Sequence, residues 1–200
     1  MFKNVMLMCI LLIPTYSRAT EFTTFSEKGI SLKTPTGCRI LGEEEIQSVR
    51  KEAKASFPKI PYTSFTSTVL LSMRCGDNGL GANLRLSYKK DKNTYTGINH
   101  KLETLSSQER RELENETKNV LINTMPSALS VSNVYVRILN REPRTGILIS
   151  YNRTGNWSVF IYNFYDERNQ RKVLLTLSYH TPEKGKFEPI FEKVVNSLQF

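Results

Sequence analysis

The last third of the chain limits the fold more than any other part. Four strand-like segments follow one another there, separated only by short, turn-rich connections: 134–139, 146–151, 157–165 and 172–180. Connections this short join antiparallel neighbours. The segments therefore predict a β-meander.

The third of these segments is apolar on both faces. Its alternation predicts one face with Trp157, Val159 and Ile161 and the other with Phe160, Tyr162 and Phe164. A sheet with two apolar faces must be covered on both sides. The end of the chain supplies one cover, because its apolar residues recur at the helical spacing expected of one continuous stripe: Phe187, Ile190, Phe191, Val194, Val195 and Leu198.

The first half of the chain mixes short strands with helices. Strands are predicted at 22–25, 29–33, 66–74 and 82–88, and 38–41 is predicted to return from the 35–37 turn as a hairpin strand. Residues 43–56 open with three glutamates, which favour a helix start. A second, polar helix is expected from Ser106 or Ser107 to about Met125, after a loop over 92–101. Helices on both sides of a mainly antiparallel sheet make an α+β protein, an α/β/α sandwich whose C-terminal amphipathic helix packs on the meander.

Two patterns near the ends of the chain resemble a known family. Residues 29–37 have the sequence Gly-Ile-Ser-Leu-Lys-Thr-Pro-Thr-Gly, and 187–200 close on Asn-Ser-Leu-Gln-Phe. Both are similar to the PsbP-like group, which includes the bacterial DcrB proteins and a nuclear-transport Ran-binding factor. Cys38 departs from the group, many of whose members have Trp at this place.

The resemblance implies the sandwich fold and a non-enzymatic role as a binding, assembly or chaperone-like module. Some bacterial relatives work beside toxin-secretion systems. The shared motif is structural, so no functional residue is carried over from the family.

The first nineteen residues have the layout of a secretory signal. Lys3 precedes an apolar run over 5–13, and 17–19 end in Ser-Arg-Ala. Nine helical residues rise only about 14 Å, half of a bilayer core of about 30 Å, so stable membrane insertion is not expected. We predict a signal peptide over 1–19, a single domain over 20–200, and a periplasmic or secreted location. Lipidation at Cys9 is the weaker alternative, because Met8 is not a small residue.

Two cysteines remain after the leader, Cys38 and Cys75. An even count in an oxidising compartment predicts a disulfide. The alternative, a metal site, would need His100 and His180, which lack the close spacing of zinc ligands. We expect no metal and no cofactor.

Catalytic motifs are missing from the sequence, which has no Gly-x-Ser-x-Gly elbow and no His-Glu-x-x-His. We therefore expect a protein that is not an enzyme. The alternative is an exported hydrolase using His180 with the nearby hydroxyls of Thr176 and Ser178. Sequons at Asn115, Asn152 and Asn156 would matter only in a glycosylating host.

The chain is basic, and removing Lys3 and Arg18 with the leader lowers its net charge from +9 to +7. Basic residues near strand ends suggest a binding rim: Arg137, Arg141, Arg144, Arg171 and Lys172. Such a rim would attract an acidic partner. We predict that the partner is another protein, with toxin neutralisation (an immunity role) as the sharpest version and a secretion or envelope accessory as the broader one. An anionic envelope polymer is the alternative, and nucleic acid is not expected outside the cell.

Overall fold

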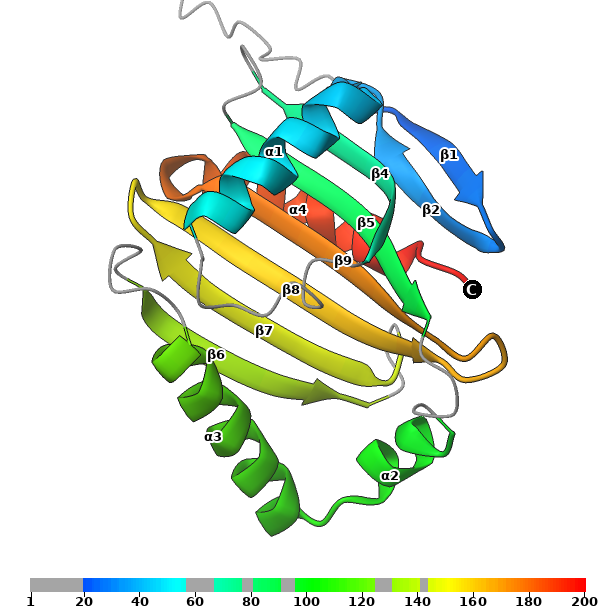
Figure 1. Cartoon of the computed structure of the whole chain (residues 1–200), viewed down its shortest axis with the longest axis vertical. Helices are drawn as coiled ribbons and strands as arrows, with labels where there is room; N and C mark the ends of the chain where they lie inside the picture. Colours follow the sequence, from blue (N-terminus) through cyan, green and yellow to red (C-terminus); the bar gives the residue numbers. More distant parts are fainter. Residues whose placement is uncertain (1–19, 57–66, 77–80, 91–95, 125–130, 141–143) are drawn as a thin grey trace, which may run out of the picture.

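The computed structural model describes residues 20–56, 67–76, 81–90, 96–124, 131–140 and 144–200 (Figure 1). Its first half contains β1 (Phe22–Glu27), β2 (Ile30–Pro35), β3 (Cys38–Ile40), α1 (Glu43–Ser56), β4 (Thr68–Cys75) and β5 (Ala82–Lys90). Its second half contains α2 (Ile98–Thr104), α3 (Ser107–Thr124), β6 (Ser132–Leu139), β7 (Gly146–Arg153), β8 (Trp157–Asp166), β9 (Arg171–His180), the 3-10 helix η4 (Thr181–Glu183) and α4 (Lys184–Asn196). The predicted α+β class is confirmed.

Seven strands form one antiparallel sheet in the order β3-β4-β5-β9-β8-β7-β6. Strands β6 to β9 are the predicted meander. The last of them, β9, pairs with β5 over nine residue pairs from Ala82↔Tyr179 to Lys90↔Arg171. This central pair joins the two halves of the chain into one sheet.

The sheet is covered on both faces, with α4 on one side and α1 crossing β4 and β5 on the other (Figure 1). The predicted stripe of α4 is confirmed, because Phe187, Phe191 and Val194 are buried. The ring of Phe191 packs against that of Tyr179 on β9, with 6.0 Å between the centroids. Phe160 pairs across the strands with Leu177 and therefore also faces α4.

Strands β1 and β2 form a separate hairpin. Its two-residue turn places both Lys28 and Gly29 at positive φ, 53° and 68°, the pattern of a type I′ turn. The chain end then pairs with β2, since Ser31 and Gln199 exchange two backbone hydrogen bonds of 2.9 and 2.8 Å. The hairpin is thus tied to the segment that follows α4.

Two local predictions were wrong. The hairpin partner of β2 is β1, and β3 pairs instead with β4, through Cys38↔Cys75. Within the predicted loop over 92–101, α2 begins at Ile98. This helix has seven residues and a glycine N-cap without a side-chain hydrogen bond, so it lacks the capping residue that would have indicated it.

The disulfide between Cys38 and Cys75 is present, as predicted. It joins β3 to the end of β4, where Cys75 is buried. None of the helices in the described part of the chain has the length and apolar character that crossing a bilayer requires.

The polar helix α3 lies along β6, the edge strand of the sheet (Figure 1). The backbone N–H of Ile138 donates to the Glu114 carboxylate at 2.8 Å, and Arg110 donates to the side chain of Asn140 at 3.1 Å. Covering an edge in this way protects it from pairing with another chain.

Candidate functional site

The predicted rim residues fall in different environments. Arg137 lies exposed on β6, and the guanidinium of Arg144 lies 5.1 Å from the centre of the Phe200 ring. Arg141 lies outside the described residues. Lys172 is half-buried on β9, where burial, together with the nearby charge of Lys89, lowers its pKa.

Arg171 is only 4% exposed, and its hydrogen bonds are to the protein itself. Its Nε donates to the Asp166 carboxylate at 2.6 Å, and its terminal nitrogens donate to the backbone oxygens of Lys28 at 2.6 Å and Gly29 at 3.4 Å. Burial alone would raise the pKa of Asp166, but hydrogen bonds from Asn169 and Arg171 outweigh it and lower that pKa. Arg171 therefore clamps the β1–β2 turn to the main sheet.

A groove of about 480 Å³ runs between α4 and the meander. We call it the meander groove and define it by its floor and banks. The floor is apolar and comes from the strands: Leu148, Phe160, Tyr162 and Leu177. Arg137 of β6 forms one bank, and Glu188 and Glu192 of α4 form the other.

The charges of the meander groove are largely uncompensated. Arg137 and Glu192 form no ion pair or side-chain hydrogen bond within the part of the chain that the structure describes. Burial, together with the nearby Tyr179 and Glu192, raises the pKa of Tyr162 to about 12, so this phenol keeps its proton at pH values where an exposed tyrosine, with a pKa of about 10, loses it. The groove thus offers an apolar floor between one cationic and one anionic bank.

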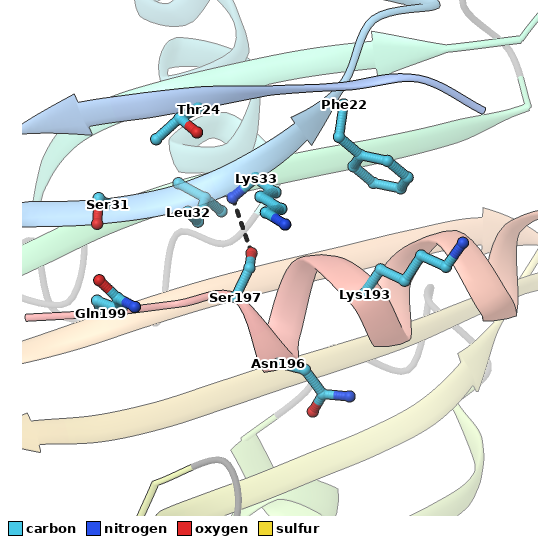
Figure 2. A pocket seen from close by; sticks show the side chains of 9 residues that line it. All are labelled: Phe22, Thr24, Ser31, Leu32, Lys33, Lys193, Asn196, Ser197 and Gln199. Atoms are coloured by element: carbon cyan, nitrogen blue, oxygen red, sulfur yellow. Dashed lines mark hydrogen bonds between the residues drawn. The ribbon is translucent and has the colours of Figure 1, made fainter.

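A second groove, of about 730 Å³, lies between the β1–β2 hairpin and the end of α4 (Figure 2). We call it the hairpin groove. Its residues come from both walls: Phe22, Thr24, Ser31, Leu32 and Lys33 from the hairpin, and Lys193, Asn196, Ser197 and Gln199 from α4 and the chain end. The ammonium of Lys193 lies 5.7 Å from the centre of the Phe22 ring, within cation–π distance.

The serine in this groove holds the two walls together. The Ser197 hydroxyl accepts a hydrogen bond from the backbone N–H of Lys33 at 2.7 Å, as Figure 2 shows, and donates to the carbonyl of Val194 at 2.8 Å. Its proton is therefore already committed to a backbone oxygen. This geometry suits a serine that links two parts of the fold. An activated nucleophile would instead need its proton directed to a base.

His180 does not assemble the catalytic cluster considered in the sequence. Its ring lies edge-on to Trp157 with 6.0 Å between the centroids. The hydroxyl of Ser178 instead accepts a 3.4 Å hydrogen bond from Asn83. Among the described residues, His180 has no hydrogen bond to the hydroxyl of Thr176 or Ser178.

No protein-family model matches the sequence, and no curated protein matches it significantly. Among solved structures, cyanobacterial PsbP (CyanoP) from Synechocystis sp. PCC 6803 is similar over 92% of this chain and 95% of that one, with a TM-score of 0.54 and 10% identity. The chain shares the PsbP fold. The Ran-binding protein Mog1p of Saccharomyces cerevisiae covers 90% of this chain and 96% of its own, with a TM-score of 0.43 and 6% identity.

The resemblance expected from the two ends of the sequence is thereby confirmed at the level of fold. An identity of 10% transfers no site residue, so the grooves rest on the geometry of this chain alone. Sequence reasoning found Arg137 but missed both grooves. One signal was present for α4: Glu188, Glu192 and Asn196 recur every four residues along one flank of the apolar stripe.

Proposed function

We propose that this protein is an exported, non-catalytic module that binds another protein through the meander groove. The observation that carries this proposal is the pairing of an apolar, aromatic floor with Arg137 and Glu192, two charges without partners of their own in the described chain. Aromatic and arginine side chains are enriched among the residues that dominate protein–protein binding energy. An apolar surface of this kind gains most when a partner covers it.

The surface beside the meander groove also presents an exposed aromatic side chain. Tyr135 precedes Arg137 by two residues on β6, so the two side chains share one face of the strand. Tyr135 is 55% exposed, which is unusual for a large aromatic residue. A partner that fills the meander groove would therefore find a further aromatic contact at the sheet edge.

The charges of the meander groove indicate which chemical groups a binding partner would carry. A fitting segment would place an apolar side chain on Leu148 and Phe160, a carboxylate against Arg137, and a basic group against Glu192. The basic mature chain would also attract an acidic protein over longer distances. Neutralisation of a toxin is the sharpest form of this role, and a secretion or envelope accessory is the broader form.

Export is supported by the leader over 1–19 and by the disulfide between Cys38 and Cys75. Disulfides persist in oxidising compartments such as the bacterial periplasm. We expect protein recovered from the periplasmic fraction to begin near Thr20 and to carry the oxidised cystine. Recovery of the intact leader on cytosolic molecules with both sulfurs free would contradict export.

The binding experiment starts from the oxidised chain over 20–200. A photo-crosslinking residue replaces Leu139 in the meander groove or, as a control, Lys51 on α1, which covers the opposite face of the sheet. A protein crosslinked only from position 139 is purified and titrated against the chain. We expect Arg137→Glu to weaken its binding at least about tenfold, the effect of losing about 1.4 kcal/mol.

Lys51→Glu serves as the matched control because it makes the same charge change away from the groove. Leu148→Lys tests the floor independently, with its melting curve measured beside the wild type. Equal affinity of wild type, Arg137→Glu and Leu148→Lys for the purified protein would overturn the meander groove as the binding surface. The hydrolase alternative is tested separately, since His180→Ala would abolish turnover in an enzyme and leave the affinity of a binder unchanged.

A further inference from the structure

The hairpin groove carries two positive charges. Lys33 and Lys193 contribute one ammonium from each wall, and none of the described residues that line the groove is acidic. Lys193 is placed over the Phe22 ring, and Lys33 makes no ion pair within the described residues. Two cations of this kind favour an anionic ligand.

The backbone of the groove offers little to an extended peptide. On the side of β2 that faces the chain end, Ser31 exchanges both of its backbone hydrogen bonds with Gln199, and the N–H of Lys33 donates to Ser197. A peptide binding as an added strand needs unpaired N–H and C=O groups along an edge. Recognition in this groove therefore falls to the side chains.

The remaining polar side chains suit a ligand rich in hydroxyl groups. Thr24, Ser31, Asn196 and Gln199 each carry groups that donate and accept, and their side chains make no hydrogen bond within the described part of the chain. A sugar hydroxyl also donates and accepts. The groove, at about 730 Å³, is larger than a single small anion requires.

We propose that the hairpin groove binds an acidic saccharide. Its carboxylate would lie between Lys33 and Lys193, and its hydroxyls would bond to the amides and hydroxyls of the two walls. No reaction is involved, because the Ser197 hydroxyl is engaged with Lys33 and Val194. This site is separate from the meander groove, so the proposed saccharide binding does not depend on the proposed function.

Calorimetric titration of the oxidised chain over 20–200 tests this site, with trigalacturonate as the probe and maltotriose as a neutral sugar of the same length. We expect trigalacturonate to bind and maltotriose to bind at least about tenfold more weakly, because charge-assisted hydrogen bonds exceed about 1.4 kcal/mol, or tenfold in affinity. Replacing both groove lysines, Lys33→Gln with Lys193→Gln, should remove this preference for the charged sugar. The control, Lys51→Gln with Lys118→Gln, also removes two charges but lies outside the groove, and it should leave the affinity unchanged.

Three results would overturn the proposal. The first is no binding of trigalacturonate at low salt, and the second is equal binding by wild type and the double lysine variant. The third is tighter binding of hexaglutamate than of trigalacturonate, which would assign the groove to acidic polypeptides. Both lysines are exposed, so matching melting curves of the variants establish that any lost binding does not come from unfolding.

Discussion

The two grooves share one helix and differ in charge. Glu188 and Glu192 of α4 line the meander groove, whereas Lys193 and Ser197 line the hairpin groove on the other flank. Asn196 lies at the border and lines both. Because residues four apart lie on the same side of a helix, a single amphipathic stripe leaves two flanks whose charges are set independently. One helix thus separates an apolar groove suited to a protein from a cationic groove suited to an anion.

The grooves also differ in how their walls are held. The floor of the meander groove belongs to the main sheet, where β7, β8 and β9 are fully paired. One wall of the hairpin groove is the separate β1–β2 sheet, held by the Arg171 clamp, the Ser31–Gln199 pair and the Ser197 hydroxyl. The meander groove should therefore resist local changes that open the hairpin groove.

Reducing the disulfide is expected to lower the free energy of unfolding more than any other change. It should not alter the ligand affinity of either groove. The cystine closes a loop with a sequence separation of 37, which in the chain-entropy model is worth about 4 kcal/mol. Urea unfolding with and without dithiothreitol measures the loss. An unchanged unfolding midpoint after reduction would contradict a stabilising cross-link, and a changed affinity of the still-folded chain would contradict its separation from both grooves.

Arg171→Met should damage the hairpin groove and leave the meander groove intact. It removes the cationic partner of the buried Asp166 carboxylate, which keeps only its hydrogen bonds from Asn169, and the Arg171 donor of the Lys28 carbonyl, at a cost of about 3 kcal/mol. Calorimetry should show loss of trigalacturonate binding, while crosslinking from position 139 persists. Equal loss at both grooves would mean that Arg171 supports the whole sheet.

The same variant has a defined pH dependence. The pKa of Asp166 is lowered in the folded chain, so the stability it contributes is present above its unfolded pKa of about 3.9 and is lost as the pH falls below that value. As the pH is lowered from about 6 to about 3, the difference in the free energy of unfolding between wild type and Arg171→Met should therefore become smaller. A gap that stays constant would exclude a charged Asp166 as the partner.

Ser197→Ala tests the hydrogen bond that links the hairpin to the end of α4, and its expected effect on stability is smaller. It leaves the Lys33 N–H without an acceptor and should cost about 1 kcal/mol. Hydrogen exchange should accelerate at the Lys33 amide and stay unchanged at Leu148, on the floor of the other groove. Ser132→Ala on exposed β6 is the matched control. Unaltered exchange at Lys33 would show that the hairpin is held without Ser197.

Tyr162, on the floor of the meander groove, is expected to have the smallest effect on stability. Its pKa is raised to about 12 in the folded chain, so the folded state keeps this proton where an unfolded tyrosine, with a pKa of about 10, loses it. Stability should therefore fall as the pH rises above about 10, and less steeply in Tyr162→Phe. Parallel curves for the two proteins would contradict a buried phenol on the groove floor.

Periodicity explains what could be predicted from the sequence. The meander and α4 follow from alternation and from the stripe through Phe187 and Phe191, which are local patterns. The sequence could have distinguished Arg171 from the exposed Arg137. Asp166 and Arg171 flank a four-residue turn, which makes these oppositely charged residues cross-strand partners. Lys33 and Lys193 carry no such local signal. Contacts between distant parts of the chain bring them together, namely the pairing of Ser31 with Gln199 and the hydrogen bond from the Lys33 N–H to Ser197.

The contrast between the grooves is tested most directly by mapping trigalacturonate on the isotope-labelled chain over 20–200 by nuclear magnetic resonance. Both grooves are then observed in one sample under identical conditions. We predict that amide shifts change at Ser31, Lys33 and Gln199 and stay fixed at Leu148 and Tyr162. Changes centred on the meander groove, or spread evenly over the basic surface, would contradict a helix that separates two sites of different chemistry.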